Sequence, residues 1–314
     1  MKVFVAGASG AMGRPLVRRL LAAGHEVTGM TRREERAAAI REAGANAVVC
    51  DVFDAPALQS AVVEAAPEAV VHQLTSLPPR LDYKAKDDPL AATNRVRSEG
   101  TRNLLAAARA AGARRLVAES VAFLYAPEGD WVKDEEAPLF HGAPAPFGGA
   151  VEALTDLERQ VTGAEGTEGV VLRYGWLYGP GTYFDRDGSQ TEEALKRRLP
   201  IVGKGTGTFS FVQVEDAAAA TVAAVERGAP GVYNVVDDEP APMRDWVPAF
   251  AEAVGAKSPR RVPAWLARLI TGSAAANTAT QLRGASNAKA KRELGWQPSF
   301  SSWRQGFRDA EARG

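Results

Sequence analysis

The chain has 314 residues, of which 46% are hydrophobic and 24% charged, and its formal net charge is zero. This composition is typical of a globular protein with ample apolar surface to bury. Balanced charge without a large basic cluster argues against nucleic-acid binding. The single cysteine, Cys50, excludes an intrachain disulfide and fits a reducing compartment. The histidines are scattered, so no Cys/His cluster has the spacing of a metal site.

The start of the chain predicts a cytoplasmic protein with no membrane partner. Residues 1–6 lead directly into a strand pattern and lack the charged head and long apolar run of a signal peptide. No uninterrupted apolar run reaches the length that a transmembrane helix needs.

Strands and helices are expected to alternate through the first half of the chain. Short apolar runs predict strands at 2–6, 26–30, 47–50, 69–73, 115–119 and 169–173. Helical patterns separate them at 14–23, 33–43, 55–65, 90–111 and 151–162. This alternation indicates parallel strands joined by right-handed crossovers, as in a Rossmann-type, doubly wound α/β fold.

The second half is less regular. Strands are expected at 209–214 and 231–236, with helices at 216–227, 243–254, 263–271 and 287–294. We therefore expect a dinucleotide-binding domain over 1–173, to which 209–236 returns. The residues 174–208 and 237–314 then form a smaller substrate-binding region. Loops at 75–89, 126–149 and 182–208 are expected to line its pocket.

Three glycines stand between the first strand and the first helix. Gly7 permits a tight turn, Gly10 lets the backbone approach a pyrophosphate, and Gly13 lets the helix pack close to the strand. The N-terminus of the helix then offers free N–H groups and a partial positive charge to the phosphates. The context of strand, turn and helix favours a dinucleotide site over a ligand-free turn.

The end of the second strand favours NADP(H) over NAD(H), although NAD(H) remains possible. An acidic residue there would bind the ribose hydroxyls, but the sequence has Arg32 and Arg33, whose guanidinium groups suit a 2′-phosphate. The alternative is that both arginines begin a solvated helix. Asp51, after the third strand, is expected either near the adenine or as the cap of the next helix.

Several motifs resemble the extended short-chain dehydrogenases/reductases, the family of NAD-dependent epimerases and dehydratases. Beside the glycine turn, they are Val70-Val71-His72, the stretch 94–105 (NRVRSEGTRNLL, with altered spacing), 172–181 (LRYGWLYGPG), 211–216 (FVQVED) and 294–298 (LGWQP). The resemblance covers nearly the whole chain. It implies a Rossmann domain, a small C-terminal substrate region and a hydride-transfer site at the ends of the fourth to sixth strands.

The resemblance also implies a Ser or Thr after the fifth strand and a Tyr-x-x-x-Lys pair. Ser120 supplies the hydroxyl, but Phe147 and Val151 occupy the Tyr and Lys positions, and Tyr-x-x-x-Lys occurs nowhere in the chain. Phenylalanine has no proton to donate, and valine cannot lower a neighbouring pKa. The usual proton-transfer pair is therefore absent.

Other side chains are then candidates for catalysis. Ser120 is expected to hold the substrate oxygen, unless it bonds the backbone. Tyr174 is the first choice of proton donor and Tyr125 the second, and both are otherwise packing aromatics. Without a neighbouring lysine, Tyr174 should keep a pKa of about 10. Cofactor contacts are expected at Gly7, Ser9, Gly10, Ala11, Met12, Gly13, Arg32, Arg33, Asp51, Val52, Leu74, Asn94 and Arg173.

These features predict an atypical reductase or epimerase acting on a carbonyl or hydroxyl group of a sugar-derived or secondary-metabolite substrate. The alternatives are a cofactor-binding sensor or scaffold without redox turnover, and a non-redox lyase or cyclase. The resemblance suggests a homodimer formed through the helices at 90–111 and 151–162. We expect no metal.

Overall fold

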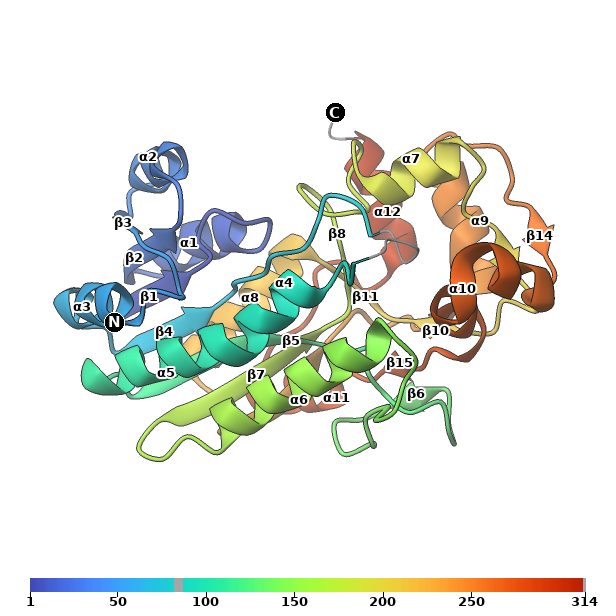
Figure 1. The fold of residues 1–314 in the computed structure, drawn as a ribbon. Coiled ribbons are helices and arrows are strands. Elements are labelled where there is room, and N and C mark those ends of the chain that lie inside the picture. Colours follow the sequence, from blue (N-terminus) through green and yellow to red (C-terminus); the bar gives the residue numbers. More distant parts are fainter. Residues whose placement is uncertain (82–86, 313–314) are drawn as a thin grey trace.

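Seven parallel strands form the centre of the computed structural model, which describes residues 1–81 and 87–312 (Figure 1). Their order in the sheet is β12-β7-β5-β4-β1-β2-β3. The bounds are β1 Lys2–Ala6, β2 Glu26–Thr31, β3 Asn46–Val49, β4 Ala69–His72, β5 Arg115–Val121, β7 Glu168–Tyr174 and β12 Gly231–Val235. The expected Rossmann-type fold is confirmed.

Helices cover both faces of the sheet, because its strands are apolar on both sides. One face packs on α1 (Gly13–Ala22) and α8 (Val214–Glu226) through a core that includes Val5, Val71 and Val117. The other face packs on α3 (Ala55–Ala65), α5 (Thr101–Ala110) and α6 (Phe147–Thr162). Helix α2 (Glu34–Glu42) connects β2 to β3. In Figure 1, α5 and α6 lie side by side in front of the sheet.

The topology determines where a ligand can bind. Strand β1 lies between β2 and β4. The chain therefore runs from β1 outward through β2 and β3, and then crosses to the other side of β1 to form β4. In such sheets the crevice for a dinucleotide opens at the carboxyl ends of the strands, at this switch point.

The helix expected over 90–111 is not regular. It consists of α4 (Ala91–Arg95), a π-helical turn (Val96–Gly100) and α5. A π-turn accommodates one extra residue within a helix and occurs frequently at functional sites. The altered spacing of the motif at 94–105 thus has a structural counterpart.

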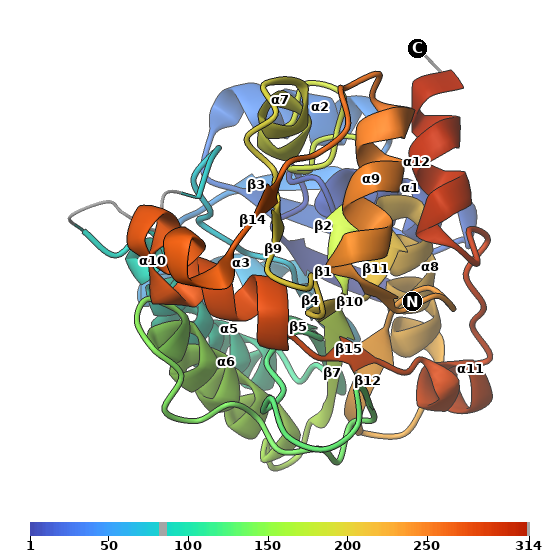
Figure 2. The ribbon, with the colours of Figure 1, turned by 90° about the vertical axis from the view of Figure 1, so that its right-hand side faces the viewer.

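The remaining elements gather at one end of the molecule, which faces the viewer in Figure 2. An aromatic core that includes Phe184, Phe211 and Trp246 holds most of them together. The strand expected at 209–214 is found as β10 and β11, whereas sequence patterns missed α7, α12, most of α10 and the other two- and three-residue strands. The elements are β6 Val132–Lys133, β8 Trp176–Tyr178, α7 Ser189–Leu195, β9 Ile201–Val202, β10 Thr208–Phe209, β11 Phe211–Gln213, β13 Ala241–Pro242, α9 Met243–Ala253, β14 Arg261–Val262, α10 Ala264–Gln281, β15 Gly284–Ala285, α11 Ala288–Leu294 and α12 Trp303–Ala312.

The division into a cofactor-binding domain and a substrate-binding region stays a prediction, although β12 does pair with β7 in the main sheet. Within the described part of the chain, no helix has both the length and the apolar character needed to cross a membrane.

A buried ion pair ties α6 to the end of β7. Arg173 donates from Nη2 to Glu158 Oε2 at 2.6 Å and from Nε to Oε1 at 2.8 Å. Both side chains are less than 10% exposed. Removing one partner of such a pair leaves an uncompensated buried charge.

Glu158→Ala should therefore lower the free energy of unfolding by about 3–5 kcal/mol. Denaturant titration measures the change. The matched control is Arg159→Ala, which breaks an exposed pair with Asp156 and should cost less than about 1 kcal/mol. Equal effects of the two substitutions would contradict a structural role for the buried pair.

Candidate cofactor and active site

Two glycines of the turn are required by the fold itself. Gly7 has φ +93°, and a Cβ there would lie 2.5 Å from the carbonyl oxygen of Gln73 on the neighbouring strand. A Cβ at Gly13 would lie 2.1 Å from the carbonyl oxygen of Gly7. The turn, the helix α1 and the end of β4 can pack this closely only with hydrogen at both positions.

Gly10 differs from its two neighbours. A Cβ built there meets only the Gly7 carbonyl oxygen, at the ordinary distance of 3.4 Å, so it would point into open space. No side chain caps the N-terminus of α1. The N–H of Arg14 donates to the Gly10 carbonyl at 3.1 Å and Pro15 has none, so the amides left for a phosphate are those of residues 11–13. An open glycine beside a free helix N-terminus is the arrangement that a pyrophosphate needs. The turn fits a dinucleotide.

The other expected contacts of the turn lie around it. Ser9 Oγ shares a hydrogen bond with Thr31 Oγ1 at 3.1 Å, which ties the turn to the end of β2. Ala11 is half-buried, and Met12 is buried in the core beneath α1. Only backbone groups and small side chains therefore face the place of the phosphates.

The arginines after β2 are exposed. Arg32 and Arg33 follow Thr31 directly, and neither takes part in an ion pair within the residues that the structure describes. Asp51 accepts a hydrogen bond from the N–H of Phe53 at 3.0 Å. The cap of α3 is Asp54, so the capping role considered for Asp51 is wrong.

Three further expected contacts follow β3, follow β4 and lie in α4. Val52 is buried, and its carbonyl accepts from Asn103 Nδ2. Leu74 is half-buried, and its N–H donates to His72 Nδ1. Asn94 Oδ1 accepts from Arg97 Nη1 at 3.4 Å. These cofactor contacts remain predictions.

The hydroxyl groups of Ser120 and Tyr174 are engaged inside the protein. Ser120 is 0% exposed, and its Oγ donates to Glu158 at 2.6 Å. The Tyr174 hydroxyl accepts from Gln73 Nε2 at 2.9 Å and lies 2.6 Å from Thr221 Oγ1. Thr221 donates its own proton to a backbone carbonyl, so Tyr174 is the donor to Thr221. Burial raises the pKa of Tyr174. The expected pKa of about 10 is therefore wrong.

Tyr125 and Arg173 are also held in place. The Tyr125 hydroxyl donates to Asn234 Oδ1 at 2.7 Å and accepts from Arg173 Nη1 at 3.0 Å. Burial raises the pKa of Tyr125 to about 12. Arg173 has its donors committed to Glu158, Tyr125 and the Glu135 carbonyl. Each of these side chains would have to break an internal bond before it met a ligand.

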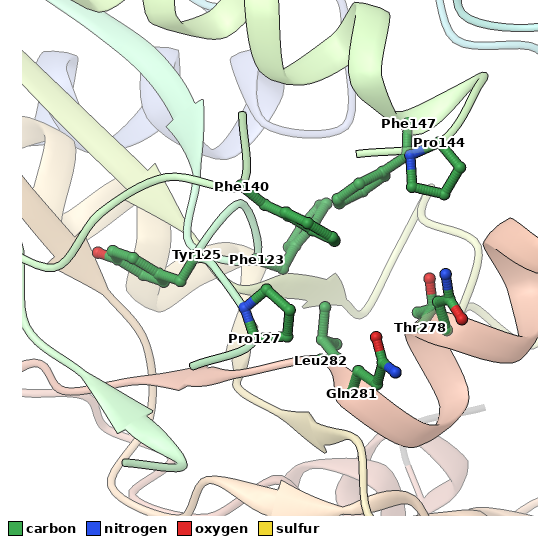
Figure 3. A pocket seen from close by; sticks show the side chains of 10 residues that line it. Phe123, Tyr125, Pro127, Phe140, Pro144, Phe147, Thr278, Gln281 and Leu282 are labelled. Carbon is green, nitrogen blue, oxygen red and sulfur yellow. The ribbon is translucent and has the colours of Figure 1, made fainter. Parts of the chain in front are cut away.

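An apolar pocket lies beyond the end of β5 (Figure 3). The rings of Phe123, Phe140 and Phe147 lie close together on one side of it, and the hydroxyl of Tyr125 points away from the other labelled side chains. Loop 126–149 contributes as expected, but the opposite wall comes from the second half of α10, beyond the helix expected at 263–271. The lining residues are Phe123, Tyr125, Pro127, Phe140, Pro144, Phe147, Asn277, Thr278, Gln281 and Leu282.

The two positions where the family has its Tyr and Lys lie in these apolar surroundings. Phe147 begins α6 and lines the pocket, while Val151 is 0% exposed and packs with Leu124 and Leu154. Neither position offers a labile proton.

A group of buried polar side chains at the ends of β4 and β5 escaped the sequence analysis. Gln73, Arg97 and Glu119 are 6%, 5% and 7% exposed. Each has one atom without a hydrogen-bond partner, namely Gln73 Oε1, Arg97 Nε and Glu119 Oε1. Burial raises the pKa of Glu119 to about 7, although the positive charge of Arg97 opposes the shift. Burial, aided by Arg97, lowers the pKa of His72 to about 4. The signal in the sequence was Glu119, a charged residue within the apolar stretch 116–124, whereas Arg97 lies in a polar stretch and gave none.

Residues 3–235 match the model of the NAD dependent epimerase/dehydratase family, so the chain belongs to that family. It is an enzyme of a nicotinamide-dinucleotide-dependent group of reductases and epimerases. The family membership expected from the motifs is confirmed.

Three similar proteins illustrate the activities of known relatives. The chain is 49% identical over 311 residues to a 3-diazoavenalumate denitrifying reductase of a Streptomyces species, covering 98% of this chain and 99% of the relative. It is 29% identical to a 2-alkyl-3-oxoalkanoate reductase of Stenotrophomonas maltophilia, covering 82% of this chain and 76% of the relative. A crystal structure of Thermus thermophilus UDP-glucose 4-epimerase in complex with NAD is similar with a TM-score of 0.74 and 26% identity, covering 100% and 99% of the chains.

Gly10→Val should abolish cofactor binding without unfolding the protein. The added side chain enters the open space that the pyrophosphate needs and meets no backbone atom closely. Calorimetry measures NADPH binding, and a melting curve reports folding. The control is Gly13→Val, whose side chain collides with the Gly7 carbonyl and should destabilise the fold. Normal NADPH binding by folded Gly10→Val would mean that the turn is misassigned.

Proposed function

We propose that this protein is an NADPH-dependent reductase that replaces a diazonium group of its substrate by hydrogen and releases dinitrogen. The proposal is supported by the 49% identity to a 3-diazoavenalumate denitrifying reductase over almost the full length of both chains. The structural observation that carries it is the apolar character of the site where the family places its proton-transfer pair.

The argument rests on proton balance. Reduction of a carbonyl group adds a hydride to carbon and a proton to oxygen, so it needs a proton donor. Phe147 and Val151 supply none, and the hydroxyls of Ser120, Tyr174 and Tyr125 are bonded inside the protein. A reaction that consumes only a hydride suits this site.

Reductive loss of a diazonium group is such a reaction. A carbon–hydrogen bond would form at the carbon that carries the diazonium group, with the hydride that NADPH supplies, and the carbon–nitrogen bond would break with its electron pair going to nitrogen. Dinitrogen would leave as a neutral molecule, with NADP⁺ as the oxidised product. The negative charge of the hydride and the positive charge of the diazonium group cancel, so no proton is taken up or released.

The pocket fits a flat, apolar substrate body. Three phenylalanine rings face a hollow whose opposite wall carries the amide side chains of Asn277 and Gln281. Apolar walls with a few polar groups are the usual composition of a small-molecule site. In this mechanism the protein orients the substrate against the nicotinamide and excludes water, which would otherwise compete with hydride for a diazonium ion.

The proposed function is tested with 3-diazoavenalumate and benzenediazonium labelled with ¹⁵N, together with NADPH deuterated at C4. We expect one dinitrogen per NADPH oxidised and deuterium in the product. A reaction without enzyme and one with Gly10→Val correct for spontaneous reduction. Phe147→Tyr should leave the rate unchanged, because no proton is needed at that position.

Other outcomes of this assay identify the alternatives. NADPH oxidation only with a panel of carbonyl compounds would overturn the diazo proposal in favour of the carbonyl reductase expected from sequence. Loss of dinitrogen without NADPH oxidation would indicate a lyase. Cofactor binding without turnover of any substrate would indicate a sensor or scaffold.

We also propose that NADPH is preferred over NADH, because Arg32 and Arg33 lie exposed after β2, where no carboxylate binds the ribose. A charge-assisted contact to phosphate contributes about 1.5–3 kcal/mol. Arg32→Ala should then weaken NADPH binding by about ten- to a hundredfold and leave NADH binding unchanged. Calorimetry with both cofactors tests this, with Arg41→Ala as the control, since Arg41 pairs with Glu34. Tighter binding of NADH to the wild type would overturn it.

The cytoplasmic location and the homodimer remain part of this proposal. The helices expected to form the dimer, α5 and α6, lie side by side on one face of the sheet (Figure 1).

A further inference from the structure

The unpartnered polar atoms of Gln73, Arg97 and Glu119 require an explanation. A buried polar group without a hydrogen bond costs free energy, and the cost is larger for a charged group. Proteins therefore retain such groups mainly where a ligand or water completes them. Here two acceptors, Gln73 Oε1 and Glu119 Oε1, accompany one donor, Arg97 Nε.

Two of the three side chains stand on adjacent strands of the sheet. His72 on β4 pairs with Ala118 on β5, so Gln73 and Glu119 are the next residues along the two neighbouring strands. Residues at alternate positions of a strand share a face, so Gln73 and Glu119 follow Val71 and Val117 on the same side of the sheet. Glu119 also acts electrostatically on Arg97 and on Tyr174, which Gln73 contacts.

Arg97 lies in the π-turn between α4 and α5, and its positive charge acts on Glu119 and on His72. Arg97 is the second residue of the turn and is buried, whereas its neighbour Glu99 is partly exposed and pairs with Arg95. In a regular α-helix the residues that follow Arg97 would be displaced by one position around the axis. The irregular turn thus allows both a buried cation and the packing of α5.

The nicotinamide half of a dinucleotide extends toward the same place. With the pyrophosphate at the N-terminus of α1, the two halves of the cofactor lie on either side of the switch point between β1 and β4. Arg32 and Arg33 after β2 mark the adenosine side. The nicotinamide then lies over the carboxyl ends of β4 and β5, where Gln73 and Glu119 stand.

We propose that Gln73, Arg97 and Glu119 bind the carboxamide of the nicotinamide ring and so fix the orientation of the hydride. A primary carboxamide carries two N–H donors and one carbonyl acceptor, which match the two free acceptors and the one free donor. The three side chains are positioning residues for hydride transfer. This inference rests on the proposed function only in requiring a bound nicotinamide dinucleotide.

The test compares the affinity of NADPH with that of its reduced 3-acetylpyridine analogue, in which a methyl group replaces the amide nitrogen. The analogue keeps the carbonyl acceptor but lacks both donors. Fluorescence titration gives both dissociation constants in the absence of substrate. Wild type should prefer NADPH by about ten- to a hundredfold, as for a hydrogen bond to a charged group.

The variants separate the two kinds of contact. Glu119→Leu should bring the preference close to one, and Glu119→Gln should retain part of it, because the amide oxygen still accepts. Arg97→Leu should weaken both cofactors alike, because both offer the carbonyl. Glu99→Leu, in the same π-turn, is the control and should change neither constant.

A purely structural role would weaken both cofactors equally in Glu119→Leu and leave the preference unchanged, which would overturn the inference. Equal affinities of the wild type for the two cofactors would overturn it too, with water as the occupant of the polar group. Because the titration needs no turnover, a failure of the diazo proposal does not affect it.

Discussion

The close approach of the first turn to the neighbouring strand is the constraint on which the site depends. The carbonyl oxygen of Gln73 lies where a side chain at residue 7 would have to be, and the carbonyl of Gly7 fills the place of a side chain at residue 13. Because these backbones are in contact, α1 begins directly beside the ends of β1 and β4. The crevice that results is lined by backbone N–H groups, and Gly10 keeps it open.

The side chains around the crevice divide into two sets. The hydroxyl groups of Ser120, Tyr174 and Tyr125 form hydrogen bonds inside the protein. Those of Ser120 and Tyr125 bond the ion pair of Glu158 and Arg173, and so they stabilise the packing of α6, β5 and β7. Gln73, Arg97 and Glu119 keep atoms without partners at the ends of β4 and β5. Polar groups whose hydrogen bonds are complete stabilise the fold, and polar groups with a free donor or acceptor are available to a ligand. This division favours orientation and electrostatics over proton transfer as the contribution of the protein.

Much of the fold was predictable because its signals are local. Apolar runs, alternating helices and the spacing of Gly7, Gly10 and Gly13 predicted the parallel, doubly wound sheet and a turn for the cofactor. The pocket wall on α10 and most short strands were not predictable, because they depend on pairing with distant segments, such as Phe211 with Trp176 and Arg261 with Ile201. The internal partners of Ser120 and Tyr174 were not predictable for the same reason, since Glu158 and Thr221 lie on later helices.

The motif at 94–105 departs from the family pattern in its spacing, and α6 departs from it in lacking the Tyr-x-x-x-Lys pair. The same chain lacks a proton-transfer pair on α6 and has a buried arginine in a π-turn opposite a buried carboxylate. A site without a proton donor can still catalyse hydride transfer if the nicotinamide is held at one distance and angle from its acceptor. Fixed charges and dipoles achieve this best when they are desolvated and already oriented, since no reorganisation is then needed during the reaction. The two proposals are therefore complementary: the buried polar group would orient the hydride donor, and the apolar pocket would place an acceptor that requires no proton.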